Sequence, residues 1–346
     1  MKIGIDVSQA VYGTGVGDYT IDLYRALNKL PLADEFIPVG FSLRRQSDLH
    51  RIFPKIRTYP IPPTALHYLW NVAHLVPVEA FTGKIDVFHA SDWTQGPARA
   101  KKVTTVHDLS PFIFPAETHP QILAVHRAKM RWIVREGDAV ICVSQNTAAD
   151  LKSLFNIPES KIAVIPEALP TRFLLHPQLV SEKNYLLAIG ARQPRKNIRR
   201  LVSAFRRFKS QYSLPDKLII IGESQTPDPW PDVQFTGYVT DQTLVNYLAG
   251  AAVFVYPSLY EGFGLPILEA FYHRVPVACS NNSSLPEVAG NAACFFDPLD
   301  EEAIAAAIST AIKNKSQLIA SGITQLTKFS WVRTARETLK VYKSLC

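Results

Sequence analysis

Residues 251–272 form the stretch that most constrains the fold of this chain. An apolar run over 251–255 is typical of a buried strand, and an apolar run over 265–272 is typical of a helix. A tight turn between them carries Gly262 and Gly264. This order lets backbone N–H groups approach a ligand, and the helix dipole favours negative charge there. The stretch therefore predicts an α/β fold with an anion site at the turn.

Two glutamates, Glu261 and Glu269, bracket this turn with seven residues between them. A carboxylate before the turn and another on the helix could accept hydrogen bonds from sugar hydroxyls on either side of a phosphate. The alternative is that the glycines only make a turn and that both glutamates are solvated. The complete run over 256–269, YPSLYEGFGLPILE, favours the first interpretation. It resembles the E-x7-E segment of family 4 retaining glycosyltransferases, which have the two-Rossmann (GT-B) architecture.

Length and composition are those of a folded protein with more than one domain. At 346 residues the chain exceeds what a single core usually holds, so two domains are expected. No apolar run approaches the roughly 18 residues of a membrane span. Residues 1–7 read as a first core strand, since Asp6 comes too early for a signal peptide. The four cysteines lack C-x-x-C spacing, which predicts reduced thiols in a cytoplasmic protein, without disulfides or a metal site.

The net charge of +7 predicts an anionic partner, which could be nucleic acid, an anionic membrane or a phosphorylated small molecule. The basic residues form no long stripe and accompany no nucleic-acid module, so we expect no nucleic-acid partner. Residues 44–57 hold a basic loop, and residues 64–81 predict an aromatic-rich amphipathic helix. This pair suits peripheral contact with the cytoplasmic face of an inner membrane. The alternative is a solvated loop beside a core helix.

Residues 1–170 predict a first Rossmann-like domain with a glycine loop after its first strand. The loop spacing, G-x-G-x-G, departs from the dinucleotide fingerprint, and the acidic pair that follows precedes the next strand instead of ending it. A dehydrogenase is therefore disfavoured. A loop whose backbone approaches a phosphate fits better, with Gly15 and Gly17 as the contacts, while Gly13 could simply make the turn.

His107 follows a predicted strand over 102–106. Residues at the carboxyl ends of parallel strands line the ligand crevice of α/β sheets. A lone histidine is usually structural. The segment VHDL with the following Pro111, however, resembles the acceptor-domain loop of the same glycosyltransferase family. The resemblance implies that this histidine contacts the transferred sugar.

Residues 171–183 are predicted as a linker and residues 184–328 as a second Rossmann-like domain. Its first loop, GARQPRKN over 190–197, stands at a helix N-terminus. Arg192 offers a planar fork and Lys196 a point charge, a pairing suited to a diphosphate. Both could instead be surface residues, as we expect for Arg195, but the family pattern favours the diphosphate role. Ala191 is a small departure from that pattern.

The resemblance also implies the remaining donor contacts. The segment FTGYV over 235–239 would place a nucleobase against the backbone near Tyr238 and Val239. The turn and helix start would contribute further contacts, which are Gly262, Phe263, Gly264, Leu265 and Pro266. Residues 329–346 predict a last helix that crosses back to the first domain, as in GT-B enzymes, anchored by Trp331.

Together these features imply two Rossmann-like domains that face a cleft and transfer a sugar from a nucleotide-diphosphate donor. Arg192 and Lys196 would stabilise the leaving diphosphate. Glu261 would hold the sugar, Glu269 would bind the ribose hydroxyls, and His107 would lie beside the sugar. No D-x-D motif stands at a strand end, so we expect metal-independent transfer without a cofactor.

Two segments bear on the donor sugar, the run EGFGLPILEA and residues 283–287. Both resemble the corresponding segments of bacterial mannosyltransferases of polysaccharide synthesis. This resemblance implies GDP-mannose as donor and a glycan or lipid-linked acceptor. UDP-glucose, UDP-galactose and an N-acetylated hexosamine are the alternative donors. A GT-B nucleotide-sugar epimerase shares the architecture, but it would not need Glu261 and Glu269 in this frame.

Overall fold

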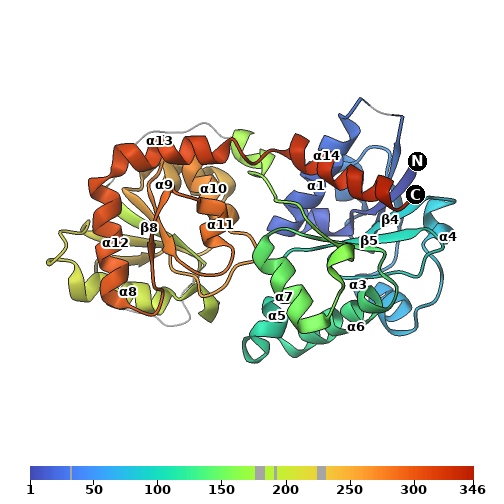
Figure 1. Ribbon diagram of the computed structural model, residues 1–346, viewed down its shortest axis with the longest axis horizontal. Helices are drawn as coiled ribbons and strands as arrows, with labels where there is room; N and C mark the ends of the chain where they lie inside the picture. The colour runs from blue at the N-terminus through green and yellow to red at the C-terminus, as the bar shows by residue number, and fades with distance from the viewer. Residues whose placement is uncertain (32, 176–183, 191–192, 224–230) are drawn as a thin grey trace. The chain divides into compact units, whose positions relative to one another are not determined.

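The computed structural model describes residues 1–31, 33–175, 184–190, 193–223 and 231–346. They divide into two compact units, Met1–Pro170 with Ser330–Cys346 and Thr171–Phe329. Each unit is a parallel sheet with helices on its two faces (Figure 1). The expectation of two Rossmann-like α/β domains is therefore confirmed.

The first unit contains a seven-stranded sheet in the order β3-β2-β1-β4-β5-β6-β7 within the described residues. Its strands are β1 Lys2–Asp6, β2 Glu35–Phe41, β3 Arg57–Tyr59, β4 Val87–Ala90, β5 Lys101–Val106, β6 Ala139–Cys142 and β7 Ile162–Val164. Alternate residues enter different cores, as the strand period of two requires. Val87 packs in the cluster of Ile3 and Leu27, whereas Phe88 packs in that of Phe41.

Helical segments cover both faces of this sheet. They are η1 Ser8–Val11, α1 Gly15–Asn28, α2 Gln46–Ile52, α3 Pro63–Leu66, the π-helix η2 His67–Val72, α4 Glu79–Thr82, α5 Ser110–Ile113, η3 Pro115–Glu117, α6 Pro120–Glu136, α7 Gln145–Phe155, η4 Glu159–Lys161 and α14 Trp331–Ser344. Ser144 caps α7, because the Thr147 N–H donates to Ser144 Oγ at 3.0 Å.

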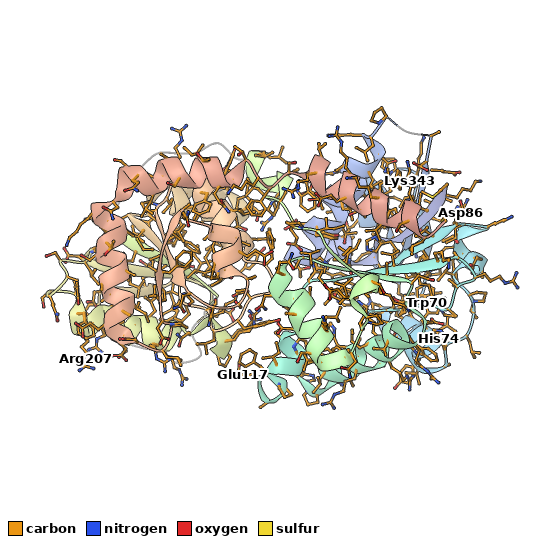
Figure 2. All side chains as sticks on the ribbon, viewed as in Figure 1. Trp70, His74, Asp86, Glu117, Arg207 and Lys343 are labelled. Atoms are coloured by element: carbon orange, nitrogen blue, oxygen red, sulfur yellow. The ribbon has the colours of Figure 1, made fainter. Side chains whose placement is uncertain are left out.

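One predicted helix of this unit is wrong. Residues 64–81 form α3, η2 and the short α4 instead of one amphipathic helix. The chain leaves the helical path after η2, because His74 and Val76 have φ angles of 53° and 60°. Trp70 nevertheless anchors the segment, since it is fully buried and its Nε1–H donates to Val76 O at 3.0 Å (Figure 2).

The last helix, α14, packs on α1 within the first unit, as expected (Figure 1). Ala335, Leu339 and Tyr342 lie on its buried face. Trp331 Nε1–H donates to Leu169 O at 2.8 Å, and its ring meets that of Tyr19 edge to face. The predicted anchoring role of Trp331 is confirmed.

The second unit repeats the topology, with described strands in the order β10-β9-β8-β11-β12-β13. These strands are β8 Tyr185–Ile189, β9 Lys217–Ile221, β10 Val233–Phe235, β11 Val253–Tyr256, β12 Val277–Ser280 and β13 Ala293–Phe296. Its helical segments are η5 Thr171–Leu175, η6 Pro194–Lys196, α8 Ile198–Phe208, α9 Asp241–Gly250, α10 Leu265–Tyr272, α11 Leu285–Ala289, α12 Glu301–Lys313 and α13 Lys315–Leu326. Phe205 of α8 and Ile308 of α12 pack in its core.

The predicted linker needs correction where the structure describes it. Residues 171–175 form η5, and Phe173 in it is fully buried in the second unit. The side chains of Arg172 and Asp241 form an ion pair that ties η5 to α9. Residues 176–183 lie outside the described part of the chain. Pro170, one of the prolines that suggested a linker, therefore precedes a packed turn.

Strand order reverses once in each sheet, between β1 and β4 and between β8 and β11. Crossover connections leave in opposite directions at such a point, and a crevice opens beyond the carboxyl ends of the two strands. These are the two places where the fold itself predicts ligand sites. No described helix is long and apolar enough to cross a bilayer.

Candidate active site

The glycine turn lies between β11 and α10 in the second unit, as predicted. Gly264 has a φ of 109°, a conformation that disfavours any side chain. A Cβ there would also stand 2.9 Å from Leu285 Cδ2. Pro266 occupies the first turn of α10, where its missing N–H costs no hydrogen bond. The sequence thus fixes both the turn and the start of the helix.

Three consecutive polar residues after β12 hold this turn in shape. The Glu261 N–H donates to Ser283 Oγ at 3.1 Å, and Asn282 Nδ2 donates to Leu259 O at 2.9 Å. The fully buried Ser284 hydroxyl lies 2.9 Å from Glu261 O and 2.7 Å from Phe263 O. The sequence indicated residues 283–287 as a sign of donor type. The contacts of Ser283 and Ser284 show that these two residues also hold the turn in shape.

Glu261 is held between two cations from the loop that follows β8. Lys196 Nζ donates to Glu261 Oε1 at 2.6 Å, and Arg195 Nη1 donates to Oε2 at 3.0 Å. Lys196 Nζ also donates to the Tyr256 hydroxyl at 2.9 Å. The side chains of both cations are 14% exposed and that of Glu261 is 9% exposed. The three residues, here called the Glu261 cluster, form a nearly buried ion network.

The charges of this cluster determine its ionisation. Burial by itself would raise the pKa of Glu261, but Lys196 and then Arg195 hold it at about 2. Glu261 is therefore a carboxylate at neutral pH. Because two cations face one anion, the cluster keeps an excess of positive charge next to the glycine turn. Such an excess suits a ligand with several negative charges.

Arg195 is the main correction among the predicted site residues. It was expected at the surface, yet its Nη1 binds both Glu261 and Tyr260 O, the latter at 2.8 Å. No sequence signal separates it from the other arginines of this region, because only the fold brings it to the turn. Lys196 lies where expected. Arg192 and Ala191 lie outside the described residues.

The remaining predicted donor contacts of this unit are in different environments. Glu269 is 5% exposed within α10. Tyr238 follows β10 and is 91% exposed, while Val239 beside it is half-buried. Gly222 and Gly237 pair their backbones just before Tyr238. The nucleobase role of this edge stays a prediction.

The first glycine loop has a structural reason of its own. Gly15 begins α1, and the Gly17 N–H donates to the capping oxygen Thr14 Oγ1 at 3.2 Å. A Cβ on Gly17 would lie 3.0 Å from Gln9 O, so glycine lets α1 pack closely on η1. Gly13 is exposed, with a φ of 61°. A phosphate contact from Gly15 or Gly17 stays a prediction.

In the first unit His107 stands at the carboxyl end of β5, as predicted. Its Nδ1 lies 2.6 Å from Glu167 Oε1, just beyond β7, and its ring meets that of Tyr19 edge to face at 4.6 Å. Burial lowers the pKa of His107, but Glu167 and then Asp92 together raise it above its ordinary value. His107 therefore tends to keep a proton near neutral pH.

A buried polar network surrounds His107. Lys129, whose side chain is 3% exposed, donates through Nζ to Asp92 O at 2.9 Å and lies 3.8 Å from Asp92 Oδ1. His89 contacts the hydroxyls of Thr105 at 2.9 Å and Tyr342 at 2.6 Å. Burial, reinforced by nearby positive charge, lowers the pKa of His89 to about 3, so it is neutral. Sequence reasoning did not identify this network, because its members come from distant segments.

A cavity of about 590 Å³ opens beside this network at the point where strand order reverses. Its floor is polar, with Asp6 and Ser91 at the ends of β1 and β4. Its walls are mainly apolar and include Trp93 and Ile122. An apolar cavity with a few converging polar groups is typical of a site for an organic ligand.

Within the described residues, no group of three or more His, Cys, Asp or Glu side chains is placed to hold a metal ion. All four cysteines are free, and Cys142 and Cys279 are buried. Burial raises the pKa of Cys142 to about 12, so this thiol is protonated. Neither thiol is suited to metal or nucleophilic chemistry in this state.

Two Rossmann-type units, each with a candidate ligand site where its strand order reverses, are typical of the GT-B fold. Family models agree, since "Glycosyltransferase Family 4" matches residues 13–173 and "Glycosyl transferases group 1" matches residues 175–321. A curated relative from Escherichia coli, "O-antigen chain mannosyltransferase B", is 33% identical over 372 aligned positions, covering 96% of each chain. The chain therefore belongs to the family 4 glycosyltransferases, and it is a glycosyltransferase.

Other comparisons extend this placement. The "O-antigen chain mannosyltransferase RfbU" of Salmonella typhimurium is 28% identical, over 64% of this chain and 63% of its own length. Among solved structures, the sucrose-phosphate synthase of Thermosynechococcus elongatus matches with a TM-score of 0.74 over 100% of this chain and 99% of its own. Its identity is 19%, so this likeness concerns the fold alone.

Proposed function

We propose that this glycosyltransferase is a retaining, metal-independent mannosyltransferase that takes mannose from GDP-mannose. Its acceptor would be a glycan or a lipid-linked glycan of a bacterial surface polysaccharide. The names of the relatives from Escherichia coli and Salmonella support the sugar and the type of product. The run over 256–269 supports the retaining class, because it has the E-x7-E form of that class.

The observation that carries this proposal is the Glu261 cluster beside the glycine turn. Cleavage of the anomeric bond leaves a nucleoside diphosphate with added negative charge. Lys196, the N–H groups at the start of α10 and, by family resemblance, Arg192 would stabilise it as preorganised donors. Glu261 is an ionised acceptor, so it could bind sugar hydroxyls while it orients Lys196. Glu269 would bind the ribose hydroxyls.

The first unit would supply the acceptor side. His107, which retains a proton near neutral pH, could donate a hydrogen bond to the transferred sugar or to the departing oxygen. The 590 Å³ cavity, with its polar floor and aromatic wall, would receive the end of the acceptor. Attack on the face from which the diphosphate leaves would retain the anomeric configuration. That the two units face one cleft is part of this proposal.

The donor is tested by thermal shift of the purified chain with a panel of nucleotides. A ligand that binds the folded state raises the melting temperature, so GDP and GDP-mannose should stabilise the protein more than UDP or UDP-sugars. Stabilisation by UDP without GDP would contradict the mannose assignment.

The reaction is tested by transfer from GDP-mannose in the presence of EDTA, followed by NMR of the product. An α-linked product from the α-linked donor, formed at an undiminished rate, is expected. A β-linkage would contradict retention, and loss of transfer that Mg²⁺ restores would contradict metal independence. Hydrolysis or epimerisation of the donor without an acceptor would favour the epimerase alternative.

A further inference from the structure

The segment between β3 and α4 is partly exposed although it lacks charged residues. Residues 58–78 contain no Asp, Glu, Lys or Arg. Four large apolar side chains of this run are nevertheless solvent-exposed, namely Tyr68 at 66%, Val72 at 48%, Leu75 at 60% and Val76 at 41%. Clustered exposed apolar side chains of this kind mark interaction surfaces more often than ordinary solvent-facing ones.

The backbone of this segment is also unfavourable for its sequence. Val76 has a φ of 60°, a conformation that β-branched residues rarely adopt. Its carbonyl accepts from Trp70 Nε1, which holds the loop in place. Its side chain is nevertheless 41% exposed. Strain combined with an exposed apolar side chain suggests that this loop makes its contacts outside the protein.

Helix α6 lies directly beside this segment (Figure 1). Both Arg131 Nη2 and Trp132 Nε1 donate to Asn71 O, at 2.9 and 2.8 Å. His74 stacks flat on Trp132 with ring centres 3.5 Å apart, and Figure 2 labels His74 at this junction. Helix α6 itself exposes Ile122 at 51% and Val134 at 45%, so the segment and the helix both present apolar side chains to solvent.

The charge on α6 is of one sign. Arg127, Arg131 and Arg135 are exposed and stand four residues apart, so they lie along one face of the helix. Glu136 is the only acidic residue of α6, and its Oε1 lies 2.9 Å from His74 Nε2. The exposed surface of this region therefore combines apolar side chains with arginines. Neither residues 58–78 nor α6 adds an exposed carboxylate to it.

We propose that this surface binds an anionic lipid bilayer. It consists of the exposed apolar side chains of residues 68–76, those of Ile122 and Val134, and the three arginines of α6, and we call it the apolar-basic face. Apolar side chains can enter the boundary between headgroups and acyl chains, while arginines bind lipid phosphates. The combination favours a bilayer over another protein, because the arginines complement anionic headgroups while the exposed apolar side chains complement the acyl chains beneath them.

One consequence depends on the function proposed above. Tyr68 and Ile122 belong to the apolar-basic face and also line the 590 Å³ cavity. A bilayer bound at this face would therefore bring a lipid-linked acceptor to the cavity mouth. Binding to lipid vesicles needs no acceptor and no donor, so its failure is distinguishable from a failure of the mannosyltransferase proposal.

The test is co-sedimentation of the full chain with vesicles of phosphatidylcholine alone or of equal parts phosphatidylcholine and phosphatidylglycerol. Binding to the anionic vesicles, weakened by added salt, is expected. The double variant Arg127→Gln/Arg135→Gln should bind them roughly 25-fold more weakly, since each arginine near an anionic surface contributes roughly fivefold. The variant Val72→Ser/Leu75→Ser should lose about tenfold or more on the same vesicles.

Matched controls lie on the second unit. Arg199→Gln/Arg207→Gln removes two exposed arginines of α8, and Ile323→Ser removes an exposed apolar side chain of α13. Both should bind like the unchanged chain, and melting temperatures check that each variant is folded. Absence of binding to anionic vesicles, or equal loss in the controls, would overturn the proposal. So would self-association in solution that Val72→Ser/Leu75→Ser abolishes while vesicle binding persists.

Discussion

The two units have the same topology but differ in how charged side chains are arranged at the carboxyl ends of their sheets. In the second unit a carboxylate, Glu261, is surrounded by two cations. In the first unit the charges come in matched pairs, His107 with Glu167 and Lys129 with Asp92. The Glu261 cluster therefore has an excess of positive charge, whereas the charges within the two pairs of the first unit balance.

This difference indicates different partners for the two ends. A fixed positive excess, with a carboxylate whose pKa is about 2, is insensitive to pH near neutrality and suits a diphosphate. The pKa of His107 is raised above its ordinary value, so the charge of His107 changes with pH on the alkaline side of 6.5. We infer that the second unit is built for electrostatic stabilisation, while the first is built to position a proton. The following variants test this contrast.

The largest effect is expected for Lys196→Ala. Removal of a preorganised donor from the developing charge of a leaving group lowers kcat by roughly 10²–10³-fold. Initial rates of transfer from GDP-mannose measure it, and Arg199→Ala, an exposed change on the same unit, is the control. A rate close to that of the unchanged chain would remove Lys196 from the reaction.

Glu261→Gln should cost stability as well as activity. It leaves Lys196 and Arg195 nearly buried without their carboxylate, which we expect to lower the free energy of unfolding by about 3 kcal/mol. Thermal melting at neutral pH measures this loss. Unchanged melting would show that the two cations find other partners.

The same residue predicts an acid dependence. The folded pKa of Glu261 is depressed from 4.5 to about 2, so its contribution of about 3 kcal/mol is present above pH 4.5. The contribution is lost as pH falls from 4.5 towards 2. The melting temperature of Glu261→Gln should therefore depend less on pH in this range than that of the unchanged chain. Parallel curves would contradict the depressed pKa.

Glu167→Gln tests the first unit. Loss of the carboxylate should lower the pKa of His107, because Glu167 is the main group that raises it. The stabilisation from protonated His107 is complete below pH 6.5 and is lost as pH rises through its folded pKa. NMR titration of the histidines should show the lower pKa. If protonated His107 supports transfer, the transfer rate falls at alkaline pH, and this fall should move to lower pH in the variant. The exposed Glu159→Gln is the control.

The smallest effect is expected for Ser284→Ala in the second unit. Two carbonyl groups of the glycine turn lose a hydroxyl partner, which should cost about 1–2 kcal/mol. The exposed Ser316→Ala on α13 should cost nothing measurable by thermal melting. If Ser284→Ala also left stability unchanged, the serine segment would not be what shapes the turn.

Local patterns in the sequence predicted most of the fold. Apolar runs of strand length and glycine turns are short-range features, so α10 was predicted with its observed bounds. The prediction of one helix over 64–81 was wrong although its apolar pattern is continuous. Pro77 within the segment cannot donate a helical N–H bond and disfavours helical backbone at Val76, which has a φ of 60°.

The candidate site divides in the same way. The sequence by itself determined the chemistry that depends on neighbours along the chain, which is the glycine turn, the two flanking glutamates and Lys196 at the start of a helix. Only the tertiary structure decided that Arg195 and Lys196 share Glu261, and that His107 meets Glu167 sixty positions later. Parallel sheets bring the ends of distant strands together, and the sequence does not show which side chains meet there.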